Sequence, residues 1–251
     1  MKKGLLIFHQ GYSDIISCLP LINYYANKYD KLKVIIRSDF IDTVNFYIKN
    51  LKNVEIYFFD IAILRNNLNP LNLVQIDDET DRLFHGSYDV YRKIDDSCRG
   101  KFNESIFYGV GFYEFYGIEI IEKIYNFSIN RDLEIEEKLF NDVVGNDNTE
   151  YIVYHENDTD KIKKDSNYKY INLENLSKNI FESITILERA KEIHIVDSVW
   201  SALCFLLDGR YQIFKNKKIY LYPFKERSGS CLWYYDKNKL SPFKPKNWVI
   251  V

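Results

Sequence analysis

The sequence predicts an α/β protein in which two halves, each built on a parallel sheet, follow one another along the chain. Short apolar runs of strand length alternate with helical segments between residues 4 and 59, and the same alternation returns between residues 151 and 222. A polar run, GNDNTE at residues 145–150, separates the two series. Strands and helices that alternate at this spacing pair in parallel through helical crossovers.

In the first half, each expected strand is a buried run rich in branched apolar residues, and each expected helix has an apolar face of helical period. The expected strands are residues 4–8, 32–37 and 54–59, and the expected helices are residues 15–29 and 41–49. The polar stretch at residues 66–81 reads as irregular.

The second half repeats this design after a charged amphipathic helix at residues 131–140. Because the polar run after that helix is the best linker candidate, we predict an N-terminal domain over residues 1–147 and a C-terminal domain over residues 148–251. The expected strands are residues 151–154, 170–173, 193–196 and 218–222, the expected helices are residues 180–190 and 199–207, and the tail is expected to pack across a surface.

The composition excludes several classes of protein. Hydrophobic residues make up 46% and charged residues 28% of the chain, as in a soluble globular protein, and a net charge of -2 gives no footprint for nucleic acid. No apolar stretch reaches the length of a transmembrane helix, and the first apolar run ends too early for a signal peptide. We therefore expect a cytoplasmic protein. The 4 cysteines lie far apart, so neither a metal site nor a disulfide framework is expected.

Polar residues follow the first expected strand, where a helix begins. Gly11 would let a ligand approach the backbone, and Asp14 could act as a general base that takes a proton from an acceptor hydroxyl. The alternative is that Ser13 or Asp14 only caps the helix. The run has too few glycines for a dinucleotide-binding fingerprint, and a Walker A loop is absent, which argues against hydride transfer and nucleotide hydrolysis.

A second junction of similar design lies between residues 193–196 and the helix that follows. Asp197 and Ser198 are typical helix-capping residues, and the free N–H groups of a helix N-terminus attract phosphate. In open α/β sheets ligands bind beyond the carboxyl ends of the strands, where this junction is expected. The alternative is an ordinary cap inside the core of the protein.

Histidines follow an expected strand in each half. His9 and His155 could bind a phosphate or take part in the chemistry, or they could be structural. Glu156 could bind sugar hydroxyls or a cation, or it could be a solvated loop acid. Arg227, in a polar loop after a strand, could contact a phosphate.

Two resemblances connect these junctions. The stretch HQGYSDIISCLPLINYY resembles the G-x-G-D-x-x-x-x-L-P start of heptosyltransferase-like (family 9-type) glycosyltransferases, with Tyr12 and Ser13 where a second glycine usually precedes the acid. The segments FYEFYGI, FSINRDLEIEEKLF, YIVYHEND and ITILERAKEIHIVDSVWSALCFLLD resemble short bacterial and phage glycosyltransferase-like proteins. Asn157 stands where that group has a second acid, and Val199 where it has a second serine.

The resemblance implies a GT-B-like fold, two Rossmann-like halves facing a central cleft, and a metal-independent sugar transfer from a nucleotide-sugar donor to a glycan or other hydroxyl acceptor. The nucleotide sugar is then a substrate, and no cofactor is implied. Asp14 and His155 are the implied catalytic residues. The implied donor-binding residues are His9, Gly11, Ser13, Glu156, Glu188, Asp197, Ser198, Ser201 and Arg227.

Two other functions stay open. The departures at Tyr12, Ser13, Asn157 and Val199 also fit a relative that binds a nucleotide or glycan without catalysis. A nucleotide-sugar epimerase can share the same two-half architecture, because fold does not fix function.

Overall fold

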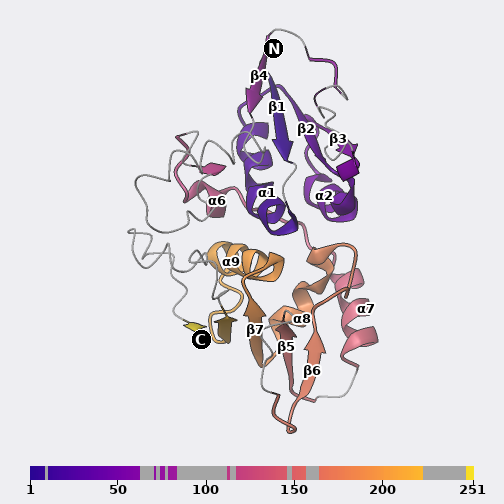
Figure 1. Ribbon diagram of the computed structural model, residues 1–251, viewed down its shortest axis with the longest axis vertical. Helices are drawn as coiled ribbons and strands as arrows, with labels where there is room; N and C mark the ends of the chain where they lie inside the picture. The colour runs from indigo at the N-terminus through magenta and orange to yellow at the C-terminus, as the bar shows by residue number, and fades with distance from the viewer. Residues whose placement is uncertain are drawn as a thin grey trace. The chain divides into compact units, whose positions relative to one another are not determined.

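The computed structural model describes residues 1–8, 11–62, 71, 74–76, 79–83, 112–113, 117–145, 149–156, 164–222 and 247–251. The chain divides into two compact units, Met1–Ile129 and Asn130–Val251, and each has its own parallel sheet (Figure 1). The α/β fold class predicted from the sequence is confirmed.

The first unit is built on a four-stranded parallel sheet with the order β3-β2-β1-β4. Its strands are β1 (Lys3–Phe8), β2 (Lys31–Arg37), β3 (Val54–Phe59) and β4 (Thr80–Leu83), and its helices are α1 (Tyr12–Ala26), η1 (Ser38–Phe40), α2 (Ile41–Ile48) and α6 (Glu122–Tyr125). The prediction of an irregular stretch over residues 66–81 is wrong at its end, where β4 begins. β4 carries no apolar run, so its sequence gives no strand signal.

Branched and aromatic side chains from β1, β2 and β3 form one core of this unit. Leu5, Ile7, Ile35 and Phe59 pack there together with Val74. Since β1, β2 and β3 are in parallel register, their carboxyl ends lie at one edge of the sheet, which we call the first carboxyl edge. Helix α1 begins at this edge.

Helix α6 packs against the middle of α1. Asn23 of α1 donates from Nδ2 to the carbonyl oxygen of Asn126 at 2.8 Å, and Asn126 caps the C-terminal end of α6. Tyr113 donates from its hydroxyl to the carbonyl oxygen of Ser17 at 3.1 Å. These contacts cover α1 on the side away from solvent.

The second unit is built on a five-stranded parallel sheet with the order β6-β5-β7-β8-β9. Its strands are β5 (Tyr151–His155), β6 (Lys169–Asn172), β7 (Glu192–Val196), β8 (Lys218–Tyr222) and β9 (Trp248–Ile250), and its helices are α7 (Leu133–Val143), η3 (Ile180–Ser183), α8 (Ile184–Arg189) and α9 (Val199–Tyr211). Most of the tail that is expected to pack across a surface, residues 233–248, lies outside the described residues. Its last residue, Trp248, begins β9, which pairs with β8.

The two faces of this sheet differ in chemistry. Helices α8 and α9 cover an apolar face: Tyr151 donates its hydroxyl to the carbonyl oxygen of Ile186 in α8 at 2.9 Å, and Trp248 donates from Nε1 to Asp208 of α9 at 3.2 Å. On the opposite face His194 stacks on Tyr220 with ring centroids 4.4 Å apart.

A buried ion pair holds α7 on the second unit. Glu136 is 1% exposed and accepts hydrogen bonds from Arg131 Nη2 at 2.7 Å and from the Thr185 hydroxyl at 2.8 Å. These contacts join α7 to α8, and the compact units accordingly divide between residues 129 and 130, before α7. The sequence places the boundary after α7, at the polar run.

None of the helices in the described part of the chain combines the length and the hydropathy needed to cross a membrane.

Candidate functional site

At the first carboxyl edge, α1 starts on an exposed glycine with a carboxylate beside it. Gly11 is the N-cap residue with φ of -67° and ψ of 170°, and its carbonyl oxygen accepts from Ile15 N at 3.0 Å. A Cβ placed on Gly11 would lie 4.0 Å from Asp14 Oδ2. The half-buried Asp14 carboxylate, in the first turn of α1, therefore lies next to the exposed Gly11. Ser13, which precedes Asp14, is also half-buried.

An aromatic cluster at the end of β2 supports the start of α1. Tyr12 stacks on Phe40 with ring centroids 4.4 Å apart and an interplanar angle of 12°, and the Tyr12 and Thr43 hydroxyl oxygens lie 2.5 Å apart. Arg37 ends β2, forms an ion pair with Asp39 and lies 5.0 Å from the centroid of the Phe40 ring. Phe40 and Thr43 were not predicted as site residues; their position shortly after the second expected strand was the available signal.

A buried thiol follows Asp14 on α1, and a buried lysine on α6 acts on that thiol. Cys18 follows Asp14 by one turn of α1 and, like Lys123 of α6, is 1% exposed. Burial raises the pKa of the Cys18 thiol most strongly, the charge of Asp14 raises it further, and the charge of Lys123 lowers it. Asp14 and Lys123 thus act on the same thiol with opposite sign.

In the second unit, His155 and the Asp197 junction follow neighbouring strands. His155 ends β5 and pairs in register with Ile195 of β7, so the chain reaches Asp197 and Ser198 just beyond that level. We call this edge, where β5 and β7 end, the second carboxyl edge. The prediction that these two junctions lie at carboxyl ends of parallel strands agrees with the register.

The imidazole of His155 is held in its neutral form. Burial lowers the pKa of His155, while the charges of Glu174 and Glu156 act in the opposite direction. Its Nδ1 is buried without a hydrogen-bond partner among the residues that the structure describes. A neutral ring at neutral pH can accept a hydrogen bond from a ligand or donate one to it, depending on its tautomer.

Ser198 and Ser201 form a capping box at the start of α9. The Ser198 hydroxyl accepts from Trp200 N at 3.3 Å, and the Ser201 hydroxyl accepts from Ser198 N at 2.9 Å. Ser201 Oγ also lies 2.7 Å from the carbonyl oxygen of Ser198 and 3.2 Å from Asp197 Oδ1. Through these hydrogen bonds Ser201, which is 1% exposed, stabilises the turn from the inside. Asp197 and Ser198 are half-exposed.

The remaining predicted residues lie in three places. Glu156 is half-buried next to His155, with Lys164 Nζ 3.9 Å from its Oε1. Glu188 lies in the last turn of α8 and binds Arg131 Nη1 at 2.7 Å. Because α8 leads directly into the start of β7, Glu188 lies at the amino ends of the strands, and the structure does not bring it together with His155 and Asp197. His9 and Arg227 lie outside the described residues.

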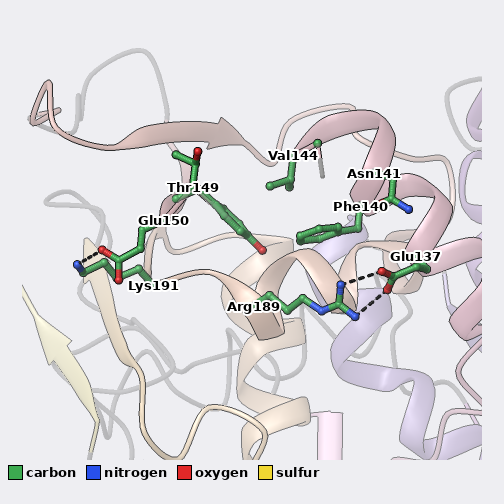
Figure 2. Close-up of a pocket in the computed structure, with 10 residues that line it drawn as sticks. Glu137, Phe140, Asn141, Val144, Thr149, Glu150, Arg189 and Lys191 are labelled. Atoms are coloured by element: carbon green, nitrogen blue, oxygen red, sulfur yellow. Dashed lines mark hydrogen bonds and ion pairs between the residues drawn. The ribbon is translucent and has the colours of Figure 1, made fainter. Parts of the chain in front are cut away.

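A pocket of about 470 Å³ also lies at the amino ends of β5 and β7, away from the second carboxyl edge. Figure 2 shows Phe140 in this pocket, flanked by two ion pairs. Arg189 binds Glu137 at 2.7 and 2.9 Å, and Lys191 binds Glu150 at 2.5 Å. The charges that line this pocket are already paired, and no predicted site residue lines it.

Within the described ranges, no three His, Cys, Asp or Glu side chains come together as a possible metal site.

Comparison with solved structures gives a neighbour for the whole chain. The crystal structure of the glycosyl transferase family 9 from Veillonella parvula DSM 2008 matches with a TM-score of 0.54 and 11% sequence identity, over 100% of this chain and 86% of that chain. No protein-family model matches the sequence, and no curated protein matches it either. The chain therefore has the fold of that structure, and the GT-B-like fold predicted from the sequence is confirmed.

Proposed function

We propose that the protein is a glycosyltransferase that moves a sugar from a nucleotide-sugar donor to a hydroxyl group of a glycan or similar acceptor. The observation that carries this proposal is the Asp14 carboxylate beside the exposed Gly11 at the first carboxyl edge. A carboxylate there can receive a proton from a hydroxyl that approaches the glycine backbone closely. The fold shared with a family 9 structure supports the same class of reaction.

In the proposed reaction Asp14 takes the proton of the acceptor hydroxyl as its oxygen attacks the anomeric carbon of the donor. The bond from that carbon to the donor diphosphate breaks, and the nucleoside diphosphate leaves with the electron pair. The transition state gains negative charge on the leaving oxygen, so N–H groups at a helix start stabilise it. This chemistry needs no metal ion.

We propose that the donor binds the second carboxyl edge. The half-exposed Asp197 and Ser198 at the start of α9 and the neutral His155 supply polar groups from neighbouring strand ends. Glu156, beside His155, is placed to meet sugar or ribose hydroxyls, and Ser201 shapes the turn from within. Ser13 remains a predicted donor contact. The same holds for His9 and Arg227, which lie outside the described residues.

Nucleotide binding tests the donor half of this proposal. The protein should bind at least one of UDP, GDP, ADP and CMP in isothermal titration, and that nucleotide should raise its melting temperature, since a ligand of the folded state stabilises it. Folded protein that binds none of the four would contradict a nucleotide-sugar donor.

Replacement of Asp14 tests the chemistry. Asp14→Asn should lower the rate of sugar transfer at least about 100-fold, the usual contribution of a general base, without changing nucleotide affinity. Asp42→Asn is the matched control, because Asp42 is also a first-turn acid, at the exposed start of α2. Equal rates for wild-type protein and Asp14→Asn would remove Asp14 from the mechanism.

One observation favours a second candidate, a nucleotide- or glycan-binding protein without catalysis. The N–H groups of Ser198 and Trp200 already bond to serine hydroxyls of the capping box, which leaves fewer donors for a leaving diphosphate. Release of free sugar or a transfer product from the donor would exclude this candidate. An epimerase would convert the donor sugar with no acceptor present, so product analysis with donor alone separates that function.

A further inference from the structure

Lys123 is a buried cation in the first unit whose place in the fold needs an explanation. Its side chain is 1% exposed, although α6, on which it lies, is a single short turn near the surface residue Tyr125. An ammonium group is almost never fully buried unless nearby negative charge or several acceptors compensate the loss of water. The side chain must therefore extend into the region that α6 shares with α1.

The packing of α6 on α1 directs this side chain toward the start of α1. Asn126 is fixed to Asn23 by the hydrogen bond at 2.8 Å, and Lys123, which precedes Asn126, acts electrostatically on Cys18, which precedes Asn23. Helical side chains lean toward the N-terminus of their helix, so the Lys123 stem points away from Asn126 and from its contact with Asn23. Because the charge of Lys123 acts on Cys18, which lies between Asn23 and Asp14 along α1, we infer that the ammonium group lies on the Asp14 side of Asn23.

Asp14 and Cys18 lie on one face of α1. Residues one turn apart are stacked on the same face of a helix, so a cation that faces Cys18 also faces the side of α1 that carries Asp14. With water excluded around Cys18, charges several ångströms apart still interact appreciably.

We propose that Lys123 is a positioning residue for Asp14: its buried ammonium group, across Cys18 from the carboxylate, keeps Asp14 ionised and oriented at the first carboxyl edge. This rests on the proposed role of Asp14 as a base, since an ionised carboxylate is what that role requires. The electrostatic coupling of the two residues is a property of the fold and can be measured without any turnover.

Other charged groups lie near the start of α1. From η1 and β2, Asp39 and Arg37 form an ion pair with each other. From α2, Asp42 is exposed, and on α6 Glu122 binds the Asn126 side chain at 2.7 Å. Lys123 is the buried cation among these described groups.

A double-mutant cycle tests the coupling. Lys123→Met, Asp14→Asn and the double variant are compared by urea unfolding. Each single change removes part of the compensation of the other charge, so the double variant should be more stable than the sum of the two single losses predicts. The same cycle with Asp42→Asn in place of Asp14→Asn should be additive. Additive losses in both cycles would overturn the proposal. A third cycle combines Lys123→Met with Glu122→Gln, and non-additivity in that cycle alone would also overturn the proposal.

A second measurement covers the case in which Lys123→Met does not fold. Asp14→Asn alone leaves Lys123 buried and less compensated, so it should lose more stability than Asp42→Asn, which removes only the favourable interaction of a first-turn acid with its helix. Equal losses, or a more stable Asp14→Asn, would overturn the proposal. Lys123→Arg, which keeps the charge, should retain most of the wild-type stability.

The acid limb of the pH–rate profile separates positioning from a merely structural role. In Lys123→Met or Lys123→Gln the limb should move to higher pH, because the carboxylate loses a nearby positive charge, and Lys123→Arg should move it back. A rate that falls without any movement of the limb would show a structural role only. If no transfer occurs in any variant, the proposed function fails, while the unfolding cycle still decides the coupling.

Discussion

At the scale of single residues, the exposed Gly11 is a glycine that the proposed function requires and the fold does not. Its φ of -67° is open to any residue, and a Cβ there would meet only Asp14 Oδ2, at an ordinary contact distance of 4.0 Å. The fold therefore does not require a glycine at this position. Gly4 differs, since a Cβ on it would approach the Tyr29 ring to 3.0 Å.

Gly11→Ala should leave the melting temperature unchanged and lower the transfer rate by about tenfold or more, because a methyl group would hold the acceptor away from the backbone and from Asp14. Thermal unfolding and initial rates measure the two effects. Gly4→Ala is the control: it should lower the melting temperature, because a methyl group there would crowd the Tyr29 ring. A Gly11→Ala protein with full activity would argue against close approach of the acceptor at this glycine.

His155 predicts a pH dependence of stability. Burial lowers its pKa in the folded protein, so below its ordinary value of about 6.5 the unfolded chain binds more protons, and stability falls as the pH falls. His155→Asn should therefore lose less stability than wild-type protein between about pH 7 and pH 5. Burial lowers the pKa of His194 in the same way, so His194→Asn should flatten the curve as well. A His155→Asn curve as steep as that of the wild type would contradict the neutral buried state.

At the scale of elements, Glu136 and Arg131 fasten α7 to α8 through Thr185 and Glu188. Glu136→Leu would remove the acceptor of the Arg131 and Thr185 donors in a buried place. Loss of one partner of a buried pair costs about 3–5 kcal/mol. Because Arg131 is partly exposed and keeps its ion pair with Glu188, we expect a loss near the lower end of that range in urea unfolding. Glu137→Gln, at the neighbouring exposed pair with Arg189, should change the stability little. Similar losses for both variants would refute this account of how α7 is held.

The sequence predicts those elements whose residues are buried on a regular period. Strands β1, β2, β3, β5, β7 and β8 have apolar runs because both faces of a parallel sheet are largely covered. Strand β4 could not be predicted, since TDRL pairs with β1 through its backbone and only its last side chain, Leu83, is apolar. Asp197 and Ser198 were found because capping residues mark helix starts, and Asp14 because acidic residues are typical of the first turn of a helix. The alternative that Ser13 or Asp14 caps α1 is wrong, since Gly11 is the N-cap residue. Lys123 and the Phe40 cluster depend on contacts between segments far apart in the sequence, which no local pattern records.

At the scale of the whole molecule, each unit has its own sheet and its own buried residues. Domains with a core of their own can in principle fold alone. The main donor contacts that we propose, His155, Asp197 and Ser198, all belong to the second unit, and Ser13 and His9 of the first unit are predicted to add only minor contacts.

Residues 130–251 expressed alone should unfold cooperatively and bind the same nucleotide as the intact protein, with an affinity within about tenfold, or 1.4 kcal/mol. Calorimetry and titration measure both properties, and residues 1–129 alone should not bind it. A folded second unit without nucleotide affinity would place the donor elsewhere.

The serine box at the start of α9 has a practical consequence for crystallography. The hydroxyl groups of the serine box already fix this turn, so its backbone does not depend on a ligand to become ordered. A nucleotide diffused into preformed crystals should then occupy this turn without cracking the lattice, and soaking should serve as well as growth in the presence of the compound.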